Sequence, residues 1–282
     1  IKYLFRFYKY IWQKRKNYDA VFVHMNPVYV VLGGLLWKMW GKKITLWFNH
    51  VEGSWSARIA AQIVFKIFFT SPFSFFVNNK KAHQMPAGIS TDVFVYNQEK
   101  RKNVNSILYL GRISPVKNIN ILIETAKILD KQKIDFNINI VGDPANKNDD
   151  QYLASLKIEA KELINKGRVK FFPAVPNSFA PDIFNQNEIF INLTNSGSYD
   201  KTILEAMACG NIVLLSNLSF KGVIDSRFIF QENNAKDLAA KIRYAFTIDN
   251  EIKEKNRKVM IDYVNSCHNL KILIKEIIAV YE

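Results

Sequence analysis

The stretch ILYLGRISPVKN, residues 107–118, decides the fold of the chain. The apolar residues at its start are typical of a buried strand, and Gly111 at the strand's end allows a tight turn. Arg112 and Lys117 follow on the connection to the next helix. A forked guanidinium and a compact ammonium together suit a diphosphate. Spacing alone favours a plainer interpretation, in which both cations are solvated and Asn118 caps the helix.

Strands and helices alternate after this stretch, which predicts a doubly wound α/β domain with a parallel sheet. Ligands of such sheets bind at the carboxyl ends of the strands, so functional residues are expected in the loops that follow strands. The expected strands are residues 107–110, 136–141, 169–172, 189–193 and 212–215. The expected helices are residues 118–131, 151–165, 201–208 and 235–246, followed by two more within 251–282.

The same alternation precedes the stretch and predicts a second, smaller parallel sheet. Its expected strands are residues 20–24, 43–49, 73–77 and 83–85, and its expected helices are 29–40 and 57–69. The polar segment 97–105, NQEKRKNVN, is the favoured linker. The resulting domains are residues 1–96 and 106–250, followed by a helical segment, 251–282, whose last helix is expected to pack back on the first domain.

A second motif, NSGSYDKTILEAMACG at residues 195–210, joins a predicted strand to a helix. Gly197 and Ser198 open a loop that runs into the helix, so free backbone N–H groups and the positive helix end can bind phosphate without a metal. Asp200 in the first turn complements the helix dipole. Glu205 lies among apolar residues and, if buried, suits ribose hydroxyls as hydrogen-bond donors. The alternative is an ordinary exposed glutamate.

Basic residues are concentrated in the first part of the chain. The net charge is +14, and residues 1–105 alone contain 16 Lys or Arg against 4 Asp or Glu. These cations alternate with aromatic residues, a pattern that attracts an anionic membrane surface or nucleic acid. Solvated helix faces explain the pattern as well. We expect no nucleic-acid partner.

Composition restricts the class of protein. The 282 residues are 49% hydrophobic and 23% charged, which fits a globular protein with room for two cores. The longest apolar stretch, residues 28–37, is shorter than the span of about 20 residues that a bilayer needs. Cys209 and Cys267 form no CxxC pair, so zinc is not expected and a reducing cytoplasm is the simplest location. No Asp-x-Asp occurs in the sequence, which argues against a nucleotide held through a divalent metal.

Five segments resemble the large retaining glycosyltransferase family four, of GT-B fold, when taken together and in order. They are PAGISTDVF (86–94), GRISPVKN (111–118), IVGDP (140–144), VKFFPAVP (169–176) and LEAMACG (204–210). The resemblance runs from about Tyr18 to the C-terminus and implies two Rossmann-like domains with parallel sheets. It also implies transfer of a sugar, with retention, from a nucleotide-diphosphate donor to an acceptor glycan. The basic first part of the chain suggests a lipid-linked acceptor, the missing Asp-x-Asp predicts transfer without a metal, and no other cofactor is expected.

The resemblance assigns roles to residues of this sequence. Arg112 and Lys117 would hold the donor diphosphate, and Glu205 would bind the ribose. Val175 would border the base. His50 would face the donor sugar, although a simple loop histidine fits equally well. The other residues expected around the donor are Gly111, Gly197, Ser198, Tyr199, Asp200, Lys201 and Thr202.

The sequence departs from the family pattern in three places. Gly197 stands where the family often has a glutamate that contacts sugar hydroxyls, so Asp200 or backbone groups would have to substitute. Ala87 stands where relatives commonly have asparagine. The chain begins with a basic aromatic helix instead of a strand and a glycine-rich loop, so the N-terminal domain is expected to be incomplete.

Two alternatives remain open at this point: a nucleotide-sugar epimerase of the same fold, and a non-catalytic relative that binds nucleotide or an anionic membrane. The expected setting is the cytoplasm, with residues 1–105 as a peripheral contact on the inner face of the membrane. The expected role is in the synthesis of cell-envelope polysaccharide.

Overall fold

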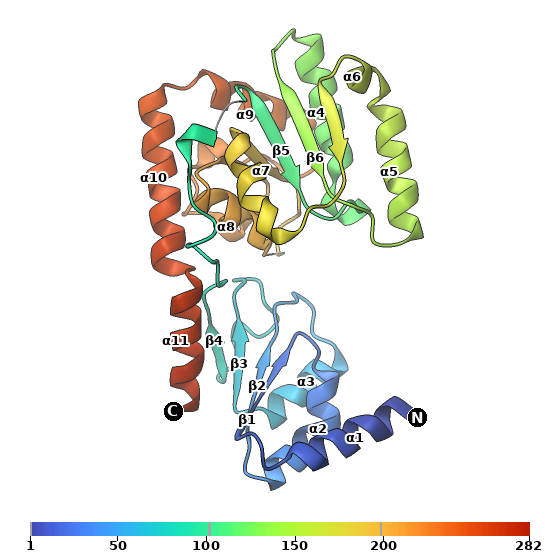
Figure 1. The fold of residues 1–282 in the computed structure, drawn as a ribbon, viewed down its shortest axis with the longest axis vertical. Coiled ribbons are helices and arrows are strands. Elements are labelled where there is room, and N and C mark those ends of the chain that lie inside the picture. Colours follow the sequence, from blue (N-terminus) through green and yellow to red (C-terminus); the bar gives the residue numbers. More distant parts are fainter. Residues whose placement is uncertain (1, 101–102, 198) are drawn as a thin grey trace. The chain divides into compact units, whose positions relative to one another are not determined.

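The computed structural model describes residues 2–100, 103–197 and 199–282 (Figure 1). Its contacts divide the chain into two units, neither of which is a continuous stretch. The first unit consists of the chain up to Pro86, residues 197–199 and Leu273–Glu282. The second unit consists of Ala87–Ser196 and Asp200–Ile272.

A four-stranded parallel sheet forms the centre of the first unit, in the order β1-β2-β3-β4. Its strands are β1 (Ala20–His24), β2 (Lys43–Trp47), β3 (Lys66–Phe69) and β4 (Ala82–Gln84). Its helices are α1 (Lys2–Lys14), α2 (Val28–Met39) and α3 (Trp55–Ile63). Helix α2 packs against α3, and both contact β2. The core of the unit therefore contains buried residues from strands and helices, such as Ile44, Leu46 and Ala60.

Two sequence-based expectations for the first unit are wrong. The helix expected over 57–69 ends at Ile63, and Lys66–Phe69 is strand β3. Periodicity does not separate a short buried strand from the end of a buried helix. Residues 73–77 form turns instead of a strand, since the Ser74 N–H donates to the Ser71 carbonyl and the Val77 N–H to the Ser74 carbonyl, both at 3.0 Å.

A five-stranded parallel sheet forms the centre of the second unit, in the order β7-β6-β5-β8-β9. The strands are β5 (Ser106–Leu110), β6 (Asn137–Val141), β7 (Val169–Phe172), β8 (Ile189–Asn192) and β9 (Ile212–Leu215). The strand order reverses between β5 and β8, and this switch point is where doubly wound sheets bind ligands. The two sheets confirm the predicted α/β class with parallel strands in both parts.

Helices cover both faces of this second sheet (Figure 1). They are α4 (Ile119–Lys131), α5 (Lys147–Glu159), α6 (Lys161–Asn165), α7 (Ala180–Gln186), α8 (Lys201–Ala208), α9 (Ala235–Thr247) and α10 (Asn250–Cys267). The last helix, α11 (Leu270–Tyr281), follows α10 directly and runs into the first unit. Helix α4 packs against α5 and α9, and α8 packs against α10. These two groups of helices bury the strands between them.

Two helices of the second unit differ from the expectation. The helix expected over 151–165 begins at Lys147, because the Asn146 side chain caps its first turn, and it is interrupted at Ala160. Helix α7 is absent from the expected set. It has seven residues with Pro181 in its first turn, so it is too short to show a helical period.

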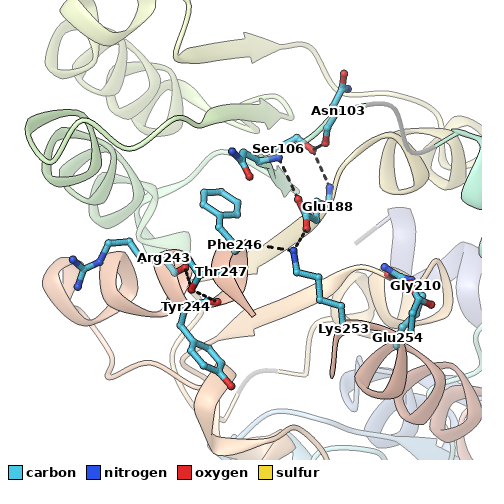
Figure 2. A network of polar contacts seen from close by, with 12 residues as sticks. Asn103, Ser106, Glu188, Gly210, Arg243, Tyr244, Phe246, Thr247, Lys253 and Glu254 are labelled. Atoms are coloured by element: carbon cyan, nitrogen blue, oxygen red, sulfur yellow. Dashed lines mark hydrogen bonds and ion pairs between the residues drawn. The ribbon is translucent and has the colours of Figure 1, made fainter. Parts of the chain in front are cut away.

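A polar network joins the starts of β5 and β8 to α10 (Figure 2). The Lys253 ammonium donates to Glu188 Oε1 at 2.8 Å, and both side chains are 13% exposed. The Asn105 N–H donates to the other oxygen of Glu188 at 3.2 Å, and the Glu188 N–H donates to the Ser106 hydroxyl at 2.9 Å. The polar segment 97–105, expected as the linker, therefore ends in contacts of the second unit.

His268 ties the first residues of the second unit to the end of α10. Its Nδ1 accepts a hydrogen bond from the Ala87 N–H at 3.0 Å, and its Nε2 lies 2.9 Å from the Tyr263 hydroxyl. The backbone repeats the link, since the Ile89 N–H donates to the His268 carbonyl at 2.7 Å. Burial lowers the pKa of His268 to about 4.

The free energy of unfolding is expected to fall as the pH drops below neutrality. The imidazole in the unfolded chain takes up a proton near pH 6.5, whereas folded His268 does so only at about pH 4. Its contribution is therefore complete above pH 6.5 and is lost as the pH falls to about 4, by about 3 kcal/mol. Urea unfolding at a series of pH values measures the loss. His268→Gln should flatten this dependence, and the exposed His83→Gln should keep it. If the free energy of unfolding changed with pH equally in the wild type and in His268→Gln, the pH dependence would not come from His268.

Candidate functional site

Two loops of the second unit meet at the switch point between β5 and β8. The Lys117 Nζ lies 2.7 Å from Asp200 Oδ2 and 3.3 Å from the Thr194 hydroxyl. Lys117 ends the 3-10 turn after β5, Thr194 follows β8, and Asp200 directly precedes α8. The structure thus brings together the two motifs that the sequence analysis singled out.

Close backbone approach shapes the loop after β5. An added Cβ at Gly142, just past the end of β6, would lie 1.9 Å from the Gly111 carbonyl oxygen, so only glycine fits there. At Gly111 itself an added Cβ would come no closer than 3.4 Å to its neighbours. Gly111 nevertheless has φ 159°, a conformation that L side chains rarely adopt, which agrees with the glycine turn predicted there; the crowded position is Gly142.

Asn118 holds the two loops together. It adopts the left-handed backbone conformation, with φ 52°, directly before α4. Its side-chain amide donates to the Leu193 carbonyl at 3.1 Å and to Asn195 Oδ1 at 3.0 Å. Its side chain makes no capping hydrogen bond, so the capping considered in the sequence analysis is wrong; the side chain instead links the cation loop to the loop after β8.

Asp200 supplies the carboxylate of this site. Besides Lys117, its Oδ2 accepts hydrogen bonds from the Thr194 hydroxyl at 2.8 Å and the Asn192 amide at 3.0 Å. Burial by itself raises the pKa of Asp200, but the charge of Lys117 and the hydrogen bonds from Asn192, Lys117 and Thr194 outweigh it. The pKa is held below its ordinary value, so Asp200 is ionised at neutral pH.

The side chain of Asp200 forms an ion pair with Lys117 and does not cap helix α8. Asp200 occupies the N-cap position, yet its side chain makes no capping hydrogen bond. Asp200 therefore pairs with Lys117 and makes no capping hydrogen bond, while its charge still lies at the positive end of α8, so the expected interaction with the helix dipole stays a prediction. The N–H groups of Lys201 and Thr202 in the first turn are not capped by this carboxylate, and such groups bind anions.

Arg112 is the second cation of the loop, and its side chain is exposed. The buried Tyr109 hydroxyl donates to the Arg112 carbonyl at 2.9 Å, which fixes the backbone of the loop, and burial raises the pKa of Tyr109. Within residues 2–100, 103–197 and 199–282, the Arg112 guanidinium makes no hydrogen bond or ion pair. Its forked donors are available to an anion near the strand ends.

Glu205 is buried in α8, with 9% of its surface exposed. Burial raises its pKa, while the charge of Lys201 and a hydrogen bond from the Asn177 side chain act in the opposite direction. The alternative of an ordinary exposed glutamate is therefore excluded. Asn177 lies two residues after Val175, so the segment expected to border a base runs next to the carboxylate expected to bind a ribose.

A cavity of about 640 Å³ opens beside Val175, between β6, β7 and α7. Val141, Phe172 and Pro173 line it near the carboxyl ends of the strands, and side-chain amides line it farther along. These amides include Asn137, Asn139 and Asn187. The volume lies in the range of small-molecule sites, about 300 to 1,000 Å³. It is large enough to admit part of a nucleotide.

The remaining residues expected around the donor are divided between the units. Gly197 has φ 101°, a conformation that favours glycine. Tyr199 is grouped with the first unit, and Ser198 lies outside the described residues. His50 is exposed in the loop after β2 of the first unit, where its ring packs edge-on against Phe48 with 5.2 Å between centroids.

Sequence analysis missed the parts that Asn177, Asn192 and Thr194 play in the site. All three lie at the carboxyl end of a strand or in the loop after it, which is the location expected for functional residues. A polar residue in such a loop is a weak signal by itself. Its partner is set by which strands are neighbours, and that is a property of the folded sheet.

Neither a membrane-spanning helix nor a cluster of metal ligands occurs among the described residues. None of their helices is long and apolar enough to span a membrane. The same residues contain no group of three or more His, Cys, Asp or Glu side chains placed to hold a metal ion.

Comparison with known proteins identifies the family. The family described as glycosyl transferases group 1 matches residues 92–265, a range that contains Arg112, Lys117, Asp200 and Glu205. The chain belongs to the group 1 glycosyltransferases. It is therefore a transferase of glycosyl groups. No curated protein sequence matches the chain significantly.

Solved structures similar to this glycosyltransferase share its fold. A glycosyltransferase from Rickettsia africae ESF-5 is 18% identical with a TM-score of 0.83, over 99% of this chain and 80% of that one. Anabaena Alr3699/HepE in complex with UDP and glucose is 15% identical with a TM-score of 0.81, over 98% and 80%. A sucrose-phosphate synthase from Thermosynechococcus elongatus is 15% identical with a TM-score of 0.78, over 99% and 76%. At these identities the likeness supports the GT-B fold, and activity has to be argued from the site.

Proposed function

We propose that this glycosyltransferase moves a sugar from a nucleotide-diphosphate donor to an acceptor, with retention at the anomeric carbon and without a metal ion. The observation that carries the proposal is the meeting of Lys117 with the start of α8 at the switch point. Arg112 follows β5 on the same loop. Two cations and a helix start supply the positive charge that a diphosphate requires. The similar Anabaena protein binds UDP and glucose, which supports a donor of this kind.

The transfer breaks the bond between the anomeric carbon and the bridging oxygen of the β-phosphate, so negative charge grows on the leaving diphosphate. Lys117 and Arg112 stabilise this charge as it develops, together with the first N–H groups of α8. Glu205 accepts hydrogen bonds from the ribose and so positions the nucleotide. The acceptor hydroxyl forms the new glycosidic bond, and its proton passes to the phosphate oxygen that the broken bond releases. The proposal of retention rests on the family resemblance.

A panel of nucleotide sugars followed by ligand-observed NMR tests the donor. The expected result is binding of one nucleotide sugar and of its nucleoside diphosphate, unchanged by a chelator. Transfer to a glycan acceptor should then give a product with the anomeric configuration of the donor. A product with the opposite anomeric configuration would contradict retention. Loss of donor binding in the presence of the chelator would contradict metal independence. Epimerised nucleotide sugar formed without an acceptor would favour the epimerase.

We further propose that the acceptor is lipid-linked and is reached at an anionic membrane surface through α1. This helix carries cations and no acidic residue in its first turn. Its exposed aromatic side chains are Tyr3, Phe5, Tyr10 and Trp12, with exposed fractions of 85%, 68%, 63% and 54%. Cations interleaved with amphipathic aromatics are typical of helices that lie in the membrane interface. The cytoplasmic, peripheral location and the role in cell-envelope polysaccharide belong to the same proposal.

Sedimentation with vesicles tests the surface of α1. Replacing Lys2 and Lys9 by Gln should weaken binding to phosphatidylglycerol vesicles by roughly tenfold to thirtyfold, since each cation near such a surface contributes about 1 kcal/mol. Replacing the exposed Lys147 and Lys161 of the second unit by Gln is the charge-matched control, and it should change binding less than twofold. Equal binding to neutral and anionic vesicles would dismiss the docking surface.

A further inference from the structure

Three donors converge on one oxygen of Asp200. They are the Lys117 ammonium at 2.7 Å, the Thr194 hydroxyl at 2.8 Å and the Asn192 amide at 3.0 Å. The side chains of Lys117 and Asp200 are 16% and 19% exposed, so this ion pair is largely shielded from water. A shielded pair with additional hydrogen bonds restrains its members far more than a surface pair does.

We propose that Asp200 is a positioning residue, which holds the Lys117 ammonium at the donor site and moderates its positive charge toward the diphosphate. The inference rests on the proposed function of Lys117. Asp200 acts through Lys117 and is not itself assigned a contact with the donor.

Positioning follows from the geometry of the ammonium. A lysine side chain is flexible and carries about 2 kcal/mol of rotamer entropy, so a free Lys117 would sample many places. The ammonium has three donors. Asp200 and Thr194 take two of them at 2.7 and 3.3 Å, which orients the group and leaves one donor for a phosphate oxygen.

Moderation of charge has a different consequence. A carboxylate beside Lys117 weakens the attraction of the ammonium for any diphosphate, including the nucleoside diphosphate that must leave after transfer. Loss of the carboxylate should therefore tighten binding of the product nucleoside diphosphate. It should also leave the Lys117 ammonium less well positioned for the reaction. These two effects have opposite signs, and a general disturbance of the fold would weaken both properties.

Asp200→Asn is the variant that isolates the charge. Asparagine has the same shape, and its side-chain carbonyl can still accept from Thr194 and Asn192. With UDP as the probe, the dissociation constant is expected to fall about threefold to fivefold. With the donor that the panel identifies, kcat is expected to fall roughly tenfold to thirtyfold with little rise in KM. Asp130→Asn, which removes the half-buried partner of Lys166, is the matched control and should change neither.

A double-mutant cycle decides whether Asp200 acts through Lys117. In a Lys117→Met background, Asp200→Asn should change the UDP dissociation constant less than twofold. An equal change in both backgrounds would overturn the inference, because Asp200 would then act on the ligand directly. A parallel loss of UDP affinity and kcat in Asp200→Asn would overturn it as well.

A measurement without ligand separates this inference from the proposed function. In a proton–carbon NMR spectrum of the lysine side chains, the Cε group of Lys117 should be rigid and shifted from those of exposed lysines such as Lys147. Asp200→Asn should move it to the position of the exposed group, and an unmoved signal would refute positioning. If the wild type shows this signal but binds no nucleotide sugar, the proposed function fails and the positioning of Lys117 stands.

Discussion

Replacing Lys117 by Ala is expected to lower kcat by a factor of about 100 to 1,000, the usual cost of removing a preorganised group that stabilises charge in a transition state. Lys117 meets the start of α8 at the switch point, and Arg112 remains as the second cation of the loop. Because the charge on the leaving diphosphate grows during bond breaking, the loss should fall on kcat more than on KM.

The same variant leaves the Asp200 carboxylate without its cation, which should cost about 1 to 2 kcal/mol of folding stability. Initial rates and thermal unfolding of the same preparation separate the two effects. Lys166→Ala, which removes an exposed cation paired with Asp130 at 2.6 Å, is the control and should leave both unchanged. A kcat within threefold of the wild type would remove Lys117 from the mechanism.

Replacing Glu205 by Ala is expected to raise the dissociation constant for the nucleoside diphosphate by about 100-fold. Two ribose hydroxyls that donate to a charged acceptor contribute about 2 to 3 kcal/mol in total once desolvation is counted, which corresponds to this factor. Burial at 9% exposure means that water replaces these hydrogen bonds poorly in the variant.

Isothermal titration calorimetry with UDP measures the change, and the exposed Glu162→Ala provides a control of equal charge. Because burial raises the pKa of Glu205, wild-type affinity should weaken as the pH falls toward that pKa, and the variant should lack this component. A dissociation constant within twofold of the wild type would show that the ribose is held elsewhere.

Local pattern was sufficient for most elements of the second unit. The expected bounds of β7 (Val169–Phe172), α8 (Lys201–Ala208) and β9 (Ile212–Leu215) agree with the structure. Glycines separate these segments from their neighbours: Gly167 lies shortly before β7, and Gly210 lies between α8 and β9. The prediction failed for the segment KIFF of β3, because a short apolar segment that follows a helix fits either a strand or a continuation of the helix.

The site could be predicted only where a general rule links sequence to topology. The placement of Lys117 and the α8 motif at one end of the sheet follows from parallel strands and the loops after them. The pairing of Lys117 with Asp200 does not follow from this rule, since the two residues are 83 positions apart in the sequence. Each also has an explanation within its own segment, Lys117 as a solvated cation and Asp200 as a partner of the helix dipole. Burial of Glu205 could not be predicted either, because apolar neighbours in the sequence fit both a buried and an exposed glutamate.

Interleaving of the two units determines how the protein can be divided. The chain leaves the first unit after Pro86 and, apart from residues 197–199, returns to it only at Leu273, so most of the final helix is part of a unit that begins at the other terminus. There the Tyr281 hydroxyl hydrogen-bonds the Thr45 hydroxyl, and its carbonyl accepts from Lys43. One proteolytic nick after Pro86 would separate residues 1–86 covalently from the rest of the chain, and only non-covalent contacts such as those of Tyr281 would hold them to the final helix. A separately expressed first half must be built as a fusion of both terminal segments, because simple truncation would strip β2 of these contacts.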